Sequence, residues 1–228
     1  VDLDKIEVKT ESEPIEDWES GSTNEGSAAE NWIQNSIEEL PVGDVGKSAD
    51  PMKEAEGTWW FQTKGGGTAV VEYDEIKGRN VIHGNSFGAG AGSWFGQVVT
   101  YRMKNANPQV YSLQFNAKGT KGKNMRCFIK TNDNKTGNRS SNVFMANDKI
   151  SNLEKPYAGY VQFTLSDTYK SYSLDFNFSK LVTAPYEYIE TDIYNVTPEA
   201  LADFFIGFYP TGGGVEFYLD DVVLKKKN

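Results

Sequence analysis

Short segments in which apolar and polar residues alternate follow one another along most of the chain. Val110–Ala117 is the clearest, with Tyr111, Leu113, Phe115 and Ala117 at one set of positions and Ser112, Gln114 and Asn116 at the other. Successive side chains of a β-strand point to opposite faces, so the alternation predicts a strand with one buried face. Tyr172–Phe178 repeats the pattern.

Further short strands are predicted before, between and after these two, at Asn31–Asn35, Thr58–Gln62, Ala69–Tyr73, Trp94–Tyr101, Arg126–Lys130, Phe204–Phe208 and Val215–Val222. The glycines of Gly65–Gly67 and of Thr211–Gly214 each predict a turn that joins the flanking strands into a pair. Thr197 and Pro198 fit the start of a one-turn helix. About nine short strands predict an all-β fold, a jelly-roll β-sandwich of two antiparallel sheets over one core.

Charge divides the chain into two parts. Residues 1–56 hold 16 acidic and 4 basic side chains, whereas residues 57–228 hold 16 acidic and 19 basic ones. We interpret residues 1–30 as an acidic linker or surface strap, and residues 31–228 as the β-sandwich module. No basic patch large enough to follow nucleic-acid phosphates is visible, so a nucleic-acid partner is not expected. No apolar run approaches the ~20 residues of a membrane span.

Catalytic chemistry finds little support in the sequence. His83 is the only histidine and Cys127 the only cysteine, and Cys127 lies in an alternating run that predicts a buried position. Jelly-roll glucanases carry Glu-x-Asp-x-x-Glu, a spacing that sets two carboxylates for glycoside hydrolysis. Here Glu72-Tyr73-Asp74-Glu75 is followed by Lys77 at the last position. We interpret these carboxylates as solvated groups at a strand end and expect no enzyme.

Side chains at the outward strand positions favour a binding surface. Gln114 and Asn116 face outward on one predicted strand, Arg126, Phe128 and Lys130 on the next, and Phe205 and Gly207 on a third. Side by side, these strands would present amides, a guanidinium group and two exposed aromatic rings. Aromatic rings stack on the apolar faces of sugars, and planar amides and guanidinium groups bond the hydroxyl rim. A surface covered by loops or by the N-terminal segment is the alternative.

Three tryptophans have distinct expected roles. Trp94 follows the small residues Gly88–Ser93, which give a ligand close access to its ring, although a core position at a strand start is the alternative. Trp59 and Trp60 are adjacent, so on a strand one of them faces the core and the other can be exposed. The sequence does not say which.

Five segments, in order, resemble carbohydrate-binding modules of families 4, 9 and 22. The opening Asn31–Glu38 is similar to their "Asn-Leu-Ile-x-Asn-Gly-x-Phe-Glu", and Trp59-Trp60 to the tryptophan that follows it. Trp94–Gln97 resembles "Trp-x-x-Gln/Glu", and Val110–Lys118 resembles "Tyr-x-Leu-Ser-Phe-x-Ala-Lys". Phe217–Leu224 resembles their closing "Val-x-Leu-Asp-Asp-Val-x-Leu", the most specific of the five. The resemblance covers roughly residues 31–228.

The resemblance implies a concave sheet that binds a β-glycan chain, xylan or a β-glucan. Trp94 would line the cleft with Gln97 as its polar partner, and Phe205 would fill a cleft position. A loop aromatic on the opposite wall, Phe144, Tyr157 or Tyr160, would close over the sugar, since all three lie in the long stretch between Lys130 and Val161.

Two further implications concern metal and context. Members of these families usually hold a structural calcium ion, at positions that match Glu38 and Asp220 in this sequence. The opening motif is one residue short and has Ser36 for glycine. The acidic lead-in resembles those seen where such a module is inserted into a xylanase of gut Bacteroidetes.

We therefore expect a secreted or cell-surface module, monomeric within a larger multidomain enzyme, that binds a neutral polysaccharide and targets an attached glycoside hydrolase to it. Three alternatives stay open. One is a stand-alone surface lipoprotein that captures glycans. Another is a structural sandwich that mediates protein contacts, and a third is a jelly-roll hydrolase or lyase, which would need paired carboxylates in the cleft.

Overall fold

A computed structural model describes residues 37–47, 59–62, 67–86, 97–103, 106–131, 142–151, 155–156, 160–183, 193–202 and 204–227. These residues form fifteen strands and one short helix, α1 (Pro198–Ala202). The strands of the N-terminal half are β1 (Gly43–Asp44), β2 (Gly46–Lys47), β3 (Trp60–Gln62), β4 (Thr68–Asp74), β5 (Arg79–Ser86), β6 (Gln97–Met103) and β7 (Val110–Gly119). Those of the C-terminal half are β8 (Asn124–Thr131), β9 (Asn142–Ser151), β10 (Lys155–Pro156), β11 (Val161–Thr164), β12 (Lys170–Thr183), β13 (Ile193–Asn195), β14 (Phe204–Pro210) and β15 (Val215–Lys226).

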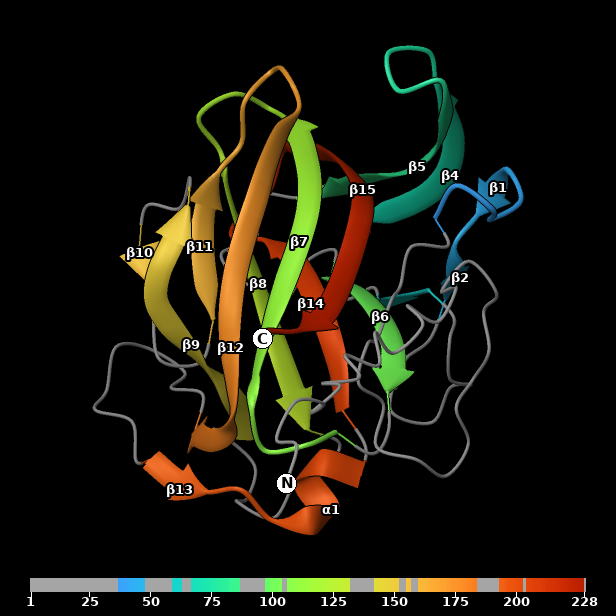
Figure 1. Cartoon of the computed structure of the whole chain (residues 1–228). Coiled ribbons are helices and arrows are strands. Elements are labelled where there is room, and N and C mark those ends of the chain that lie inside the picture. Colours follow the sequence, from blue (N-terminus) through green and yellow to red (C-terminus); the bar gives the residue numbers. More distant parts are fainter. Residues whose placement is uncertain are drawn as a thin grey trace, which may run out of the picture.

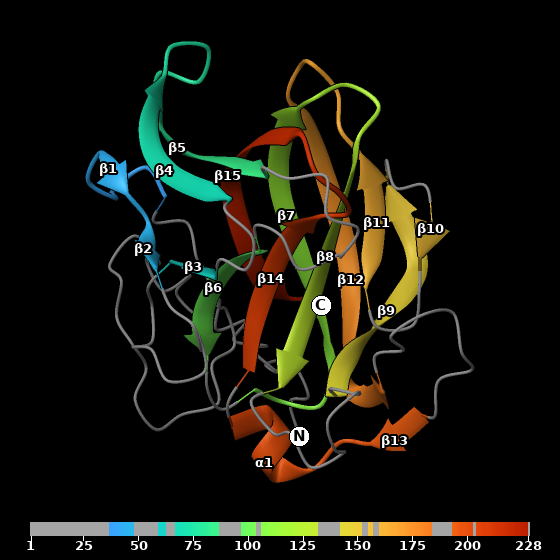
Figure 2. The same ribbon diagram turned by 180° about the vertical axis from the view of Figure 1, so that it is seen from behind.

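The strands form two layers that face one another. Their pairing order runs β1-β4-β5-β15-β7-β12-β9-β8-β14-β6-β3-β2, and every pair is antiparallel except β2 with β3. Strands β7, β12 and β15 belong to one layer and β8 and β14 to the other, as Figures 1 and 2 show from opposite sides. Strand β9 pairs with β12 and with β8, so it joins the layers at one side. The predicted all-β sandwich of antiparallel sheets is confirmed.

Alternation along the strands places the core between the layers. The apolar positions of β7 and β12 (Tyr111, Leu113, Phe115, Ala117, Tyr172, Leu174, Phe176 and Phe178) are all buried in one cluster. From the opposite layer, Met125, Cys127 and Ile129 of β8 and Phe204, Ile206 and Phe208 of β14 enter the same cluster. The expected burial of Cys127 is therefore confirmed, and burial raises the pKa of its thiol well above the ordinary value.

Both predicted glycine-turn pairs are wrong. Strand β3 pairs with β2 and β6, whereas β4 pairs with β1 and β5. Likewise β14 pairs with β8 and β6, and β15 with β5 and β7. The strands on either side of each glycine-rich stretch therefore have no hydrogen-bonded pairing with one another. A run of glycines permits a tight hairpin but does not require one, because the pairing is decided by which strands share a layer.

A hairpin that the sequence did not reveal joins β4 to β5. The Asp74 carboxylate accepts hydrogen bonds from the backbone N–H groups of Ile76 (2.8 Å) and Lys77 (3.0 Å). The N–H of Gly78 closes the turn on the carbonyl of Asp74 at 2.7 Å, with Gly78 at a φ of 69° that favours glycine. Asp74 is buried, so its expected solvated position is wrong.

Strand β9 lies inside the stretch between Lys130 and Val161, which the sequence predicted as a long loop. Phe144 and Ala146 of β9 are buried in the main core, whereas Val143 and Met145 pack in a second apolar cluster on the other face. A strand covered on both faces reads as a continuous apolar run and shows no alternation. Phe144 is 0% exposed, so its expected place in a ligand-closing loop is wrong.

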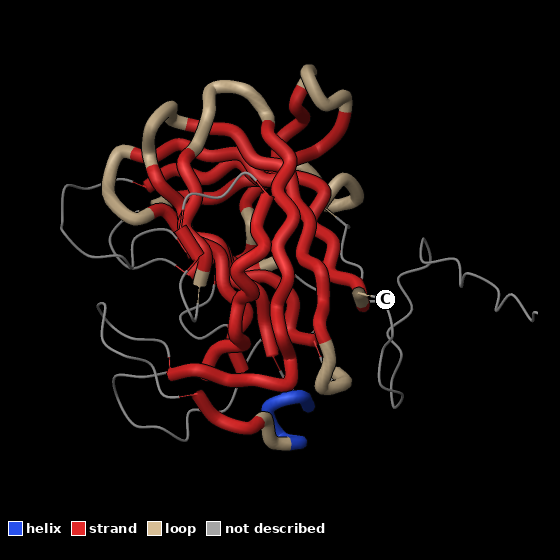
Figure 3. Tube along the Cα trace, turned by 60° about the vertical axis from the view of Figure 1, so that its left-hand side comes forward, coloured by secondary structure: helices blue, strands red, loops and turns tan. Residues whose placement is uncertain are grey.

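The predicted one-turn helix is confirmed as α1. The hydroxyl oxygen of Thr197 accepts a hydrogen bond from the Ala200 N–H at 3.3 Å, as an N-cap does. Figures 1 and 3 place α1 near β13 at one end of the sandwich. The predicted strand Asn31–Asn35 and the Trp94 end of Trp94–Tyr101 lie outside the described residues. Within the described part of the chain, no helix is long and apolar enough to cross a membrane.

Replacing Phe144 by alanine tests its core position. The ring stacks on Phe178 (centroids 4.0 Å apart, 9° between planes) and meets Phe204 edge-on at 5.8 Å. We expect Phe144→Ala to lower the free energy of unfolding by about 3–5 kcal/mol. The control Tyr73→Ala, at a ring that is 58% exposed, should change it little. Urea unfolding followed by circular dichroism measures both, and a Phe144→Ala protein as stable as the wild type would contradict the assignment.

Candidate functional site

A second apolar cluster lies on the side of β8 and β14 that faces away from the main core. Its buried members are Phe128, Val143, Tyr160, Val182 and Phe205, and Met145 and Tyr209 pack against it partly exposed. The outward direction predicted for Phe128 and Phe205 is therefore right. Their predicted exposure is wrong, because the rings are only 9% and 3% exposed and pack edge-on at 6.0 Å.

Gly207 makes room for this cluster. It pairs with Phe128 across β14 and β8, and a Cβ atom at Gly207 would come within 2.4 Å of the Phe128 ring. The ring therefore lies directly over the glycine backbone. Glycine in a strand interior often marks such a close approach.

Arg126 is held at the edge of this cluster by three aromatic or amide side chains. Its guanidinium carbon lies 4.5 Å from the centroid of the Tyr160 ring, within the range of a cation–π contact. Its Nε donates a hydrogen bond to the Gln162 Oε1 at 3.1 Å. Burial raises the pKa of Tyr209, and a hydrogen bond with Arg126 opposes that rise without cancelling it. A guanidinium group, an amide and a phenol thus meet at one place.

Trp60 extends the same surface across the sheet. Trp60 pairs with Val99 of β6, and Val99 pairs with Gly207. Gly207 in turn pairs with Phe128. Directly paired residues share a face of the sheet, so Trp60 lies on the same face as Phe128. Trp60 is partly exposed and its ring lies against Gly46, whereas Trp59 is buried in the main core. The structure therefore assigns the core position to Trp59 and the outward position to Trp60. We call the outward side of β3, β14, β8 and β11, with Trp60, Tyr209, Arg126, Tyr160 and Gln162, the β8–β14 face.

Gln114 and Asn116 do not belong to the β8–β14 face. They lie on β7, which pairs with β12 and β15 in the opposite layer, so the single surface predicted from the sequence does not form. The Asn116 amide donates to Asp221 and accepts from the Ser171 hydroxyl, both at 2.6 Å. This amide is engaged in a polar network of its own layer.

The remaining predicted ligand residues are less completely placed. Tyr160 lies on the β8–β14 face beneath Arg126 and is only 8% exposed, so its predicted place in a loop on the opposite wall is wrong. Gln97 is the first residue of β6, where it pairs with Gln62. Trp94 and Tyr157 lie outside the described residues.

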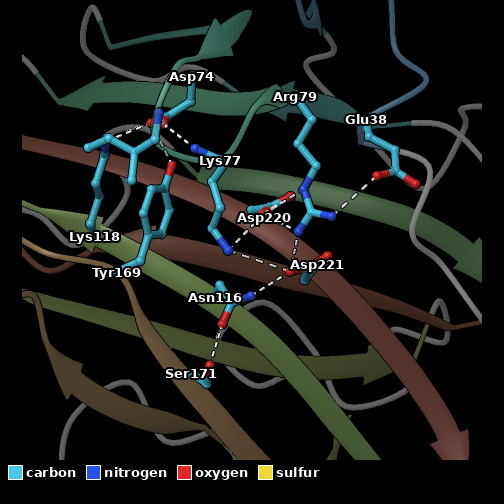
Figure 4. A network of polar contacts seen from close by, with 11 residues as sticks. Glu38, Asp74, Lys77, Arg79, Asn116, Lys118, Tyr169, Ser171, Asp220 and Asp221 are labelled. Carbon is cyan, nitrogen blue, oxygen red and sulfur yellow. Dashed lines mark hydrogen bonds and ion pairs between the residues drawn. The ribbon is translucent and has the colours of Figure 1, made fainter.

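The outer side of the opposite layer carries a network of charged and aromatic groups around Asp74 (Figure 4). The Lys118 ammonium lies 2.6 Å and the Tyr169 hydroxyl 2.9 Å from the same carboxylate oxygen. Burial by itself would raise the pKa of Asp74, but hydrogen bonds from Lys118, the Lys77 backbone and Tyr169 outweigh it and hold that pKa below the ordinary value. Asp74 therefore stabilises the turn and the sheet.

The two expected calcium ligands, Glu38 and Asp220, do come together, with Arg79 between them. The Arg79 Nη1 lies 3.4 Å from the Glu38 Oε2, and the Arg79 Nη2 lies 2.8 Å from the Asp220 Oδ2. Lys77 lies 3.2 Å from the same oxygen of Asp220. Two cationic side chains at the carboxylates do not fit a bound calcium ion.

A hollow of about 380 Å³ lies near α1. Its lining is apolar apart from one threonine, namely Ala106, Pro108, Val196, Thr197, Pro198, Leu201 and Ala202. It lacks the convergent polar groups that orient a sugar.

Two solved structures share this fold. One is a candidate sugar-binding protein from Bacteroides thetaiotaomicron, with a TM-score of 0.70 and 20% identity over 85% of this chain and 100% of that chain. The other is a family 4 carbohydrate-binding module, with a TM-score of 0.51 and 14% identity over 86% of this chain and 100% of that chain. No protein-family model and no curated protein matches the sequence. At these identities the likeness establishes the fold.

The Asp74 network predicts a pH-dependent contribution to stability. Since the folded-state pKa of Asp74 lies below the unfolded value of about 3.9, the contribution is present above that value and is lost as the pH falls through the folded-state pKa. We expect Asp74→Asn to unfold at a lower urea concentration than the wild type at pH 7. The gap between the two midpoint concentrations should narrow below about pH 4. Asp167→Asn, which removes an exposed ion pair with Lys121, is the control. An equal gap at both pH values would contradict the role assigned to Asp74.

Proposed function

We propose that this chain is a non-catalytic module that binds a neutral polysaccharide, xylan or a β-glucan, through the β8–β14 face. One observation carries the proposal: the Arg126 guanidinium group lies over the Tyr160 ring and donates a hydrogen bond to Gln162, with the Tyr209 phenol beside it. The only carboxylates that the sequence suggested for catalysis, Glu72 to Glu75, lie on the hairpin of β4 and β5 in the other layer.

The chemistry of this arrangement suits a sugar ring. A pyranose offers an apolar C–H face, which stacks on an aromatic ring, and adjacent hydroxyls, which match a guanidinium or amide fork. Arg126, Gln162 and Tyr209 are partly exposed, so they keep surface for a ligand while their neighbours fix their orientation. Groups ordered before binding lose little conformational entropy when a ligand arrives.

Trp60 and Trp94 have complementary places in this proposal. Trp60 lies on the same face as Phe128, so it offers a second stacking ring. Trp94 precedes β6 by three residues and keeps the role predicted from the sequence, a ring that lines the cleft with Gln97. Tyr157, which precedes Tyr160 in the chain, is proposed to close over the bound sugar.

The shared fold supports glycan binding as the class of function, since the two similar structures are described as a sugar-binding protein and a carbohydrate-binding module. We further propose that the module is secreted or cell-surface and acts as a monomer inside a larger glycoside hydrolase. A few stacking and hydrogen-bond contacts give dissociation constants in the micromolar to millimolar range, which correspond to binding free energies of about −8 to −4 kcal/mol. Such modest affinity is sufficient to raise the local concentration of an attached enzyme near its substrate.

Isothermal titration with xylohexaose, cellohexaose and laminarihexaose tests the proposal. We expect one of them to bind, and Arg126→Ala and Gln162→Ala each to weaken binding about tenfold or more, because each removes a hydrogen-bonding partner. Arg126→Lys keeps the charge but loses the planar fork, so it should weaken binding almost as much. Trp94→Ala should abolish binding.

Gln114→Ala is the matched control, because Gln114 is an outward amide on the opposite layer. It should bind like the wild type, and circular dichroism verifies that each variant is folded. If no glycan binds the wild type, the proposal fails in favour of a sandwich that contacts proteins. If Gln114→Ala loses binding while Arg126→Ala keeps it, the ligand uses the other layer.

A further inference from the structure

Five charged side chains from three separate segments meet on the layer that contains β7 and β15 (Figure 4). Glu38 precedes β1, Lys77 and Arg79 flank Gly78 at the β4–β5 turn, and Asp220 and Asp221 lie in β15. The cluster therefore ties the beginning of the described chain and the β4–β5 hairpin to the last strand.

An irregularity in β15 brings both aspartates to the same cations. Consecutive strand residues normally point to opposite faces, so Asp220 and Asp221 would diverge in a regular strand. The pairing of β15 with β7 shifts register between Asp220 and Val223, and Asp221 has a φ of 51°. Such a bulge with one residue in the left-handed region re-aims side chains, and aspartate tolerates that conformation better than most residues.

Cationic side chains contact one oxygen of each of the three carboxylates. The Oδ2 of Asp220 accepts hydrogen bonds from the Arg79 Nε (3.2 Å) and Nη2 (2.8 Å), and the Lys77 ammonium lies 3.2 Å away. The Oδ2 of Asp221 accepts from the same Arg79 Nη2 and lies 3.6 Å from Lys77. Glu38 contacts the other guanidinium nitrogen.

The charges of the cluster also disfavour a bound calcium ion. Asp220 is 0% exposed, and a buried carboxylate is costly unless a cation neutralises it. Arg79 supplies that charge: burial opposes its protonated form, but the hydrogen bond and attraction of Asp220 and the attraction of Asp221 raise its pKa above the ordinary value. Calcium needs 6–8 oxygen ligands at about 2.3–2.6 Å and would be repelled by two fixed cations. No metal-binding group of three His, Cys, Asp or Glu side chains occurs among the described residues.

We infer that Arg79 and Lys77 take the place of a structural calcium ion, so that the cluster holds the fold together without any metal. This inference concerns stability and does not rest on the proposed function. The Oδ1 of Asp220 is buried and accepts no hydrogen bond from the described residues. Without the two cations, the carboxylates of Glu38, Asp220 and Asp221 would lose their counter-charges, which an added divalent cation could then supply.

Thermal unfolding in excess calcium and in excess EDTA tests the inference. The wild type should melt at the same temperature in both, and calorimetric titration with calcium chloride should show no binding. The double variant Lys77→Ala/Arg79→Ala should melt lower than the wild type in EDTA, and calcium should raise its Tm by about 4 °C or more. Adding Asp220→Asn should remove the calcium response.

Lys121→Ala is the matched control, because Lys121 forms an exposed ion pair with Asp167 outside the cluster. It should show no calcium response. A wild type that melts higher in calcium than in EDTA, or that binds calcium in the titration, would overturn the inference. So would a folded double variant that does not respond to calcium, and if the double variant does not fold, the wild-type titration still decides. Neither readout involves a glycan, so a failure here is distinct from a failure of the proposed function.

Discussion

Phe115 packs where the two layers meet, and its contacts constrain the rest of the sandwich. Its ring stacks on Tyr172 of its own layer, with centroids 5.0 Å apart. It meets Phe208 of the opposite layer edge-on at 5.0 Å and packs at a tilt against Phe163 at 5.3 Å. Because side chains alternate along a strand, fixing Phe115 inward also fixes Gln114 and Asn116 outward. A slip of one residue would bury those amides without partners, so packing of the aromatic layer sets the register on which both outer surfaces depend.

The two outer surfaces use similar residue types in different roles. On the β8–β14 face, a second apolar cluster supports the partly exposed Arg126, Gln162 and Tyr209 from beneath, which leaves a rigid surface of aromatic and planar polar groups. On the opposite layer, the cations Lys77, Arg79 and Lys118 are taken up by buried aspartates. Arginine serves as a surface group in the first case and as the counter-ion of a buried carboxylate in the second, and only the neighbouring side chains distinguish the two.

The sequence predicted the positions of many strands, but it did not predict correctly which strands pair with one another. Strands with one buried face, such as Val110–Gly119 and Lys170–Thr183, were visible because their alternation is a local property. Strand β9 was not visible, because apolar residues cover both of its faces. For the candidate site, the outward direction of Arg126 and Phe128 followed from alternation, but the role of Gln162 did not, since its contact with Arg126 depends on the pairing of β11 with β8.

What the sequence determined by itself was therefore the fold class, the inward and outward positions of the clear strands, the short helix after Thr197 and the burial of Cys127. Each of these follows from the spacing of residues that are close together in the sequence. The tertiary structure decided which strands share a layer, which sets Gln114 and Asn116 apart from Arg126, and it decided that Phe128, Phe144 and Phe205 are covered. It also decided that Glu38 and Asp220 meet at Arg79. These outcomes depend on contacts between residues far apart in the chain, which no local pattern specifies.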